Sequence, residues 1–119
     1  MYWPPKPDAH PLVLDVQDKE AIYSTLNDLE IDILVNNAGL GKGFEALFEA
    51  NPDDLQTTLK TNVIGAAHVI RAVDPGMVKR NQWHLVNIGS VDGLYPINSS
   101  VYGSSKGAIH SMYKICGLN

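Results

Sequence analysis

Short apolar runs alternate with amphipathic stretches along this chain. The apolar runs cover residues 12–16, 31–36 and 84–88, each about the length of a strand. The run over 31–36 is almost continuous, which is typical of a parallel strand buried on both faces. We therefore expect an α/β fold in which helices connect parallel strands.

The first connecting stretch carries the signals of a helix start. Asp18 is a favoured N-cap residue, and Ile22, Leu26 and Leu29 follow it on one helical stripe. These positions predict a helix from Asp18 to about Leu29.

The second connecting stretch predicts a longer helix. Asn51-Pro52-Asp53-Asp54 combines an N-cap residue, a proline at the first helical position and two acids that the helix dipole favours. We expect this helix to run to about Val73 and to end or kink at Pro75-Gly76. A last helix is expected from Tyr102 onward.

Composition narrows the classes of function. With 119 residues and 45% hydrophobic content, the chain is one globular domain at most, which we place at residues 12–119. Residues 1–11 hold four prolines and should be an irregular N-terminus. The net charge of −4, without a run of Lys or Arg, gives no reason to expect a nucleic-acid partner.

The sequence contains no signal for a membrane partner or a metal. No apolar run is long enough to cross a bilayer, and the single Cys116 allows a reducing compartment, so we predict a cytoplasmic protein. The four histidines and Cys116 show no metal-ligand spacing, so we expect them to be structural.

The candidate chemistry lies in Asn62, Ser90, Tyr102 and Lys106. Tyr102 and Lys106 are four positions apart and therefore share one helix face, where an ammonium would stabilise a phenolate. Ser90, at the end of an apolar run, is expected to orient a substrate oxygen. Asn62 falls on the inner stripe of the long helix.

Each of these residues also has a purely structural interpretation. Tyr102 and Lys106 could form an amphipathic pair on a surface helix, and Asn62 could be a core amide with satisfied hydrogen bonds. A serine-hydrolase nucleophile is disfavoured at Ser90, because G-x-S-x-G requires glycine where the chain has Ile88.

Five segments resemble, in order and near the right spacing, the motifs of the short-chain dehydrogenase/reductase family. They are Leu14-Asp15-Val16, Ile33-Leu34-Val35-Asn36-Asn37-Ala38-Gly39, Thr61-Asn62-Val63, Val86-Asn87-Ile88-Gly89-Ser90 and Tyr102-Gly103-Ser104-Ser105-Lys106. Within the family, residues 71–77 and 88–90 look most like the NADP-dependent 3-hydroxy acid dehydrogenases of the serine and allo-threonine type.

The resemblance implies an oxidoreductase that transfers hydride between NADP, or NAD, and a small secondary alcohol or carbonyl compound, with 3-hydroxy acids as one class. Tyr102 would exchange the proton and also contact the cofactor, and Lys106 would assist it and contact the cofactor ribose. Ser90 would position the carbonyl or alcohol. Asn62, at a helix kink, would hold a proton-relaying water through its main chain.

The resemblance also implies cofactor contacts and an assembly. Asp15 would lie near the adenine, with a strand-end residue that caps the following helix as the structural alternative. Asn37, Ala38 and Gly39 would line the cofactor side of their strand. The same family pairs its subunits through helices, which correspond here to residues 52–73 and 102–119.

Parts of the family's pattern do not occur in the sequence. The glycine-rich turn that binds the pyrophosphate, T-G-x-x-x-G-x-G, is missing. In the strand order 3-2-1-4-5-6 the chain would supply strands three to five, so we expect an internal fragment of a doubly wound Rossmann-type parallel sheet that lacks the first two and last strands. Residues 12–16 should then either pair directly with 31–36 or leave the sheet poorly closed.

A second function therefore stays open. Without the glycine-rich turn, the chain could be a catalytically inactive remnant or a dimerising interaction protein that binds no cofactor. Ser90 and Tyr102 are twelve positions apart where the family usually has thirteen, and Asp92 replaces a small residue beside Ser90. Both changes bear on activity, because a shift of about 1 Å in such a set can cost on the order of a hundredfold in rate.

Overall fold

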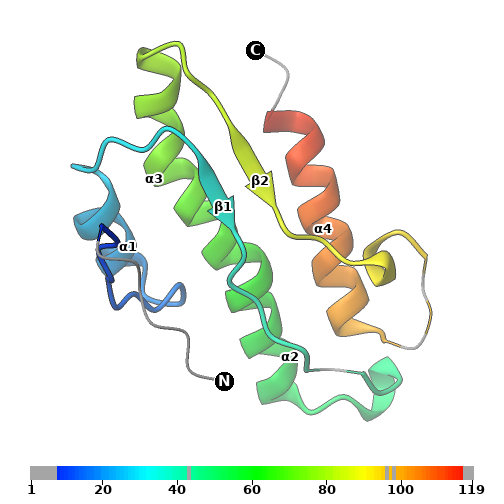
Figure 1. The fold of residues 1–119 in the computed structure, drawn as a ribbon. Helices are drawn as coiled ribbons and strands as arrows, with labels where there is room; N and C mark the ends of the chain where they lie inside the picture. The colour runs from blue at the N-terminus through cyan, green and yellow to red at the C-terminus, as the bar shows by residue number, and fades with distance from the viewer. Residues whose placement is uncertain (1–7, 43, 96, 98, 117–119) are drawn as a thin grey trace.

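The computed structural model describes residues 8–42, 44–95, 97 and 99–116. Within these residues the sheet consists of two parallel strands, β1 (Leu34–Asn36) and β2 (Leu85–Asn87) (Figure 1). Leu34 lies opposite Leu85 and Asn36 opposite Asn87, so both strands end at the same edge. The predicted α/β fold with a partial parallel sheet is confirmed.

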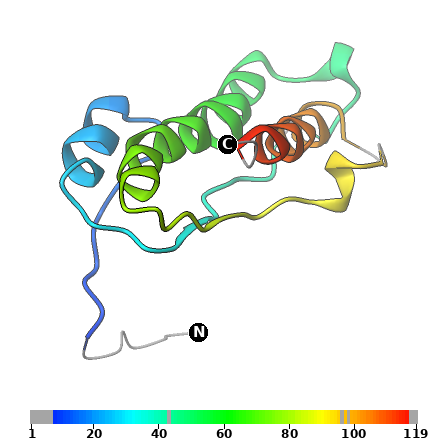
Figure 2. The same cartoon turned by 90° about the horizontal axis from the view of Figure 1, so that it is seen from above.

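Helices cover one face of this sheet, as Figure 2 shows. The helical elements are α1 (Lys19–Leu26), α2 (Pro52–Leu59), the π-helical η2 (Lys60–Gly65), α3 (Ala66–Lys79) and α4 (Val101–Cys116), with short 3₁₀ turns η1 (Leu47–Glu49) and η3 (Val91–Gly93). Leu34 packs half-buried against the helices and Leu85 is buried, whereas Val35 is 57% exposed. The prediction that this strand is buried on both faces is therefore wrong for the described residues, because their helices all lie on one side.

The strand expected at residues 12–16 does not form. Leu14 and Val16 pack half-buried against the apolar cluster between α1 and α3, and Val13 is exposed. A strand needs a neighbour that offers free N–H and C=O groups, and the described part of the chain places none beside this segment. The alternative of direct pairing with residues 31–36 is thereby wrong.

Both predicted helix starts are confirmed. The Asp18 carboxylate accepts a hydrogen bond of 3.1 Å from the Ala21 N–H. The Asn51 side-chain oxygen accepts bonds from the N–H groups of Asp53, at 2.8 Å, and Asp54, at 3.4 Å. These caps satisfy N–H groups that have no partner within the helix.

The second helical run continues through Pro75, which lies inside α3. Of the two predicted outcomes, an end at this proline is therefore wrong, and a kink close to the end of the helix stays a prediction. Pro75 has no N–H for the carbonyl of Arg71, but Arg71 lies on the exposed side of the helix, where water can replace the bond. The helix ends instead at Lys79, and Asn81, two residues later, has a left-handed φ of 54°. The N–H of Gln82 then closes the turn on the Met77 carbonyl at 3.0 Å, as in a Schellman motif.

The helix α1 is held on α3 by apolar and polar contacts. Ile22, which is fully buried, packs with Val69 and Ala72. Beside them the Tyr23 hydroxyl lies 2.9 Å from His68 Nδ1 and accepts a hydrogen bond of 3.0 Å from Arg71. Among the helices of the described residues, none combines the length and the apolar character needed to span a membrane.

Candidate active site

The helix α4 carries two of the predicted site residues, Tyr102 and Lys106, one turn apart. Lys106 is only 7% exposed, and its Nζ donates a hydrogen bond of 3.1 Å to the carbonyl of Ile88. The same Nζ lies 6.0 Å from the centre of the Tyr102 ring. A buried ammonium requires polar partners, and only one of its three protons is used by this carbonyl.

Ser90 follows β2 and begins the turn η3. Its Oγ accepts a hydrogen bond of 3.2 Å from the Asp92 N–H, and its side chain is half-buried. Ser90 and Lys106 line the same cavity of about 420 Å³, together with Asn87 and Ile109. The structure therefore brings the predicted serine and the predicted lysine to one hollow at the end of β2.

Asn62 lies in the π-helical turn η2 and is 1% exposed. Its side-chain oxygen accepts from the Leu40 N–H at 2.9 Å, and its amide nitrogen donates to the Leu40 carbonyl at 3.0 Å and to Ser105 Oγ at 3.1 Å. The amide thus connects the long helix, the turn after β1 and the helix α4. Where the sequence leads us to expect a kink, the helix forms a π turn, a feature often found at functional sites.

The turn after β1 approaches both of these residues. A Cβ placed on Gly39 would lie 3.3 Å from Lys106 Nζ and 3.4 Å from the Asn62 side-chain oxygen. Asn36, the last residue of β1, anchors the turn by donating a hydrogen bond of 3.1 Å to the carbonyl of Ala66. Asn37 and Ala38, between them, are exposed and open to a ligand.

Asp15 is placed elsewhere, in the turn before α1. Its carboxylate accepts a hydrogen bond of 2.9 Å from the Gln17 N–H, and its carbonyl accepts one of 2.9 Å from the Asp18 N–H. The adjacent Val16 lies against Gly65 of η2, whose added Cβ would be 2.6 Å from the Val16 carbonyl oxygen. Asp15 therefore has a local structural role, and its predicted contact with an adenine stays a prediction.

Two residues of the site were not predicted from the sequence. Ser105 is fully buried, accepts the bond from Asn62 and donates one of 2.6 Å to the Tyr102 carbonyl. Ser105 lies three residues after Tyr102 and therefore on the same helix face, and this spacing could have indicated that it belongs to the site. Phe44 lies with its ring centre 5.3 Å from that of Tyr102, and no local pattern in its loop indicates this contact.

The described residues give no sign of a metal centre, since no three His, Cys, Asp or Glu side chains among them lie close enough together to hold an ion. The arrangement instead offers a buried cation and a serine that line one cavity, with the Tyr102 ring 6.0 Å from the cation; Tyr102 itself is not among the residues that line this cavity. Such a set can orient an oxygen atom and exchange a proton with it.

Comparison with known proteins adds to this geometry. The family described as short chain dehydrogenase matches residues 5–118. NADP-dependent 3-hydroxy acid dehydrogenase YdfG from Escherichia coli is 46% identical over 99 residues, which make up 78% of this chain and 40% of that protein. An NADP-dependent 3-hydroxy acid dehydrogenase from Schizosaccharomyces pombe is 38% identical over 105 residues, with 83% and 40% covered. The chain thus spans about 40% of the length of these curated relatives.

Solved structures show the same likeness. Serine dehydrogenase from Escherichia coli aligns with a TM-score of 0.78 at 43% sequence identity, over 83% of this chain and 49% of that one. NAD+-bound xylitol dehydrogenase aligns with a TM-score of 0.84 at 36% identity, over 90% and 44%. The alignment covers less than half of either enzyme.

Proposed function

The chain belongs to the short-chain dehydrogenase family, and we propose that it carries the proton-transfer site of an NADP(H)-dependent oxidoreductase. The reaction interconverts a secondary alcohol and a carbonyl compound. The observation that carries this proposal is Lys106, a buried cation that faces the Tyr102 ring and shares a cavity with Ser90. A surface pair would leave the ammonium in water, whereas this one is withdrawn from it.

Each residue has a distinct task in the proposed reaction. The Tyr102 hydroxyl gives its proton to the carbonyl oxygen, or takes one from the alcohol in the reverse direction. Lys106 stabilises the negative charge that remains on the phenol. Ser90 hydrogen-bonds the substrate oxygen, and the main chain of Asn62 supports proton exchange with solvent.

The residues present fit the nicotinamide and ribose end of an NADP molecule. Gly39 lacks the Cβ that would crowd Lys106, and a Cβ on Gly89 would meet nothing within 4 Å, so backbone is accessible at both strand ends. Asn37 and Ala38 lie exposed beside Gly39. Lys106 keeps protons for ribose hydroxyls, and Asp15 is assigned to the adenine. When bound, the nicotinamide supplies or takes up the hydride.

The substrate class follows from the relatives. Both curated proteins are named as 3-hydroxy acid dehydrogenases that depend on NADP, and a similar solved enzyme is named serine dehydrogenase. We assign a 3-hydroxy acid as substrate and NADP as cofactor, with NAD, which is bound in the xylitol dehydrogenase structure, as the alternative.

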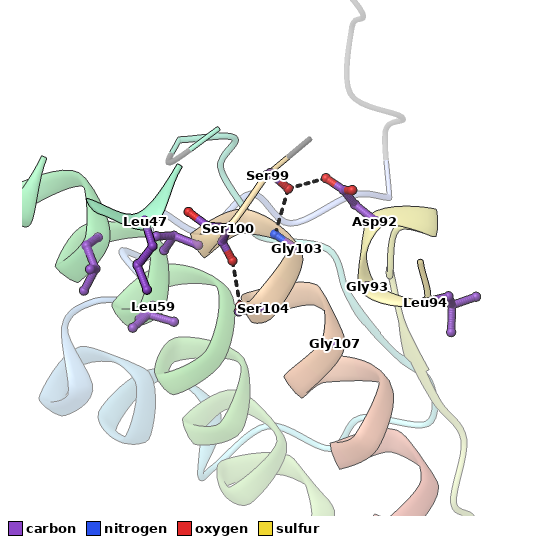
Figure 3. Close-up of a pocket in the computed structure, with 12 residues that line it drawn as sticks. Leu47, Leu59, Asp92, Gly93, Leu94, Ser99, Ser100, Gly103, Ser104 and Gly107 are labelled. Atoms are coloured by element: carbon purple, nitrogen blue, oxygen red, sulfur yellow. Dashed lines mark hydrogen bonds between the residues drawn. The ribbon is translucent and has the colours of Figure 1, made fainter. Parts of the chain in front are cut away.

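A homo-oligomer through α2 and α4 is the second proposal. A cavity of about 560 Å³ lies between these helices, and its lining includes Leu47, Leu55 and Leu59 (Figure 3). Leu47 is 62% exposed. An apolar hollow of this kind is suited to side chains of a partner helix, so this function would survive in a chain that binds no cofactor.

The test of the oxidoreductase proposal is Tyr102→Phe, which removes the hydroxyl and keeps the ring that contacts Phe44. Oxidation of a 3-hydroxy acid, followed by NADPH absorbance, should slow by roughly 10²- to 10⁴-fold. Binding of NADPH, followed by tryptophan fluorescence, should persist, because the aromatic ring and Lys106 remain. The control is Tyr95→Phe in the exposed connecting loop, which should keep wild-type turnover.

An absence of any fluorescence or thermal shift with millimolar NADPH would end the enzyme interpretation for this chain. Sedimentation of the same sample decides the second proposal. A monomer at high concentration would exclude the homo-oligomer.

A further inference from the structure

Asp92 lies two positions after Ser90, and its carboxylate has specific partners. One oxygen accepts a hydrogen bond from the Ser99 hydroxyl, and the other accepts one of 3.2 Å from the Ile97 N–H. Its own N–H donates to Ser90 Oγ at 3.2 Å. Asp92 thus holds both the serine of the site and the far end of the loop that leads to α4.

Ser99 passes this contact on to the helix of Tyr102. Its Oγ accepts a hydrogen bond of 3.0 Å from the N–H of Gly103, in the first turn of α4. Figure 3 shows the bonds from Ser99 to Asp92 and Gly103 beside the cavity. Because first-turn N–H groups have no partner within a helix, Ser99 acts as a cap that the Asp92 carboxylate orients.

The turn η3 also touches the backbone of α4 directly. A Cβ on Gly93 would lie 2.6 Å from the Lys106 carbonyl carbon, and one on Gly107 would lie 3.3 Å from the Gly93 oxygen. Similarly, a Cβ on Gly103 would lie 3.1 Å from the Asp92 carbonyl oxygen. Because these glycines have no side chains, the backbones of η3 and α4 pack in direct contact. Asp92 and Ser99 lie at the N-terminal end of this contact.

We infer that Asp92 is a positioning residue that sets the distance between Ser90 and Tyr102; the inference rests on the proposed oxidoreductase function. The connection from Ser90 to Tyr102 spans twelve positions. The Asp92 carboxylate holds this loop through the Ile97 N–H and fixes the start of α4 through Ser99. Its negative charge beside a helix N-terminus adds to the stabilisation.

The kinetic test uses Asp92→Ala, Ser99→Ala and the double variant. Asp92→Ala should lower kcat roughly tenfold to a hundredfold and leave the KM for NADP unchanged, because misplacement of the proton donor affects the reacting geometry. The double variant should be no slower than Asp92→Ala, since both changes break one connection. Asp92→Asn, which keeps an oxygen acceptor for Ser99, should restore part of the rate.

A second arm needs no turnover. In Asp92→Ala the Gly103 amide should exchange its hydrogen faster, and the NMR signals of the Tyr102 ring should move. Asp53→Ala, which removes an exposed acid from the first turn of α2, is the matched control and should leave both unchanged. The inference would be overturned if the wild type turns over substrate and Asp92→Ala has the same kcat and the same Gly103 amide exchange rate. If the wild type shows no turnover, the proposed function fails for this chain, and the exchange and ring signals alone decide on Asp92.

Discussion

The two strands have the same sequence, Leu-Val-Asn, and lie in register, yet their last residues differ in environment. Asn36 of β1 donates a hydrogen bond of 3.1 Å to the Ala66 carbonyl. Asn87 of β2 has both polar atoms of its side chain buried, and neither has a hydrogen-bond partner among the described residues. The same amide is satisfied at one strand end and unsatisfied at the other.

The neighbouring helix explains this difference. The strand β1 contacts α3, whose backbone at the start of the helix offers a carbonyl, whereas β2 contacts α4. There the buried Lys106 bonds to Ile88, and Asn87 lines the cavity that Ser90 also lines. A hydrogen-bonded amide at a strand end anchors a turn, whereas a buried amide without a partner among the described residues carries an uncompensated desolvation cost.

The largest expected effect concerns the Asn62 amide, which connects the turn after β1 to α4. Asn62→Ala removes three hydrogen bonds and leaves the N–H and carbonyl of Leu40 without partners. Urea unfolding should show a loss of about 3 kcal/mol. Asn27→Ala, at an exposed position after α1, should change stability by less than about 0.5 kcal/mol. Equal effects of the two variants would mean that Asn62 does not hold the turn.

An intermediate effect on stability, of opposite sign at the two strands, is expected when the last asparagine of each strand is replaced by leucine. Asn36→Leu should lose about 1 kcal/mol of stability, because a buried hydrogen bond disappears. Asn87→Leu removes a buried amide without a protein partner, so stability should stay the same or rise by about 1 kcal/mol. Denaturant midpoints of both variants provide the measurement, and a larger loss for Asn87→Leu would contradict the comparison.

The smallest effect is expected at the glycines that follow the strands. Gly89→Ala places its Cβ in open space and should stabilise the chain by about 0.5 kcal/mol through a less flexible unfolded state. In Gly39→Ala the Cβ approaches Lys106 and Asn62, so this gain should be cancelled. Thermal unfolding of both variants tests this, and a higher Tm for Gly39→Ala than for Gly89→Ala would exclude the close approach.

The sequence predicts a structural feature correctly where that feature depends only on neighbouring residues. Asp18 and Asn51 cap helices as predicted, because a cap needs only its own side chain and the next three residues. The expected end at Pro75 was wrong because a single missing bond on an exposed helix face does not outweigh the packing of the rest of α3.

The sequence by itself determined the α/β class, the helix starts and the family, together with the candidate residues Asn62, Ser90, Tyr102 and Lys106. These follow from residue identity and spacing, which are properties of short segments. The tertiary structure decided which strand face is covered, that residues 12–16 stay unpaired, and which partners Asn62 and Asp92 find. Those outcomes depend on groups five or more residues away, whose position is set by how helices pack rather than by any local pattern.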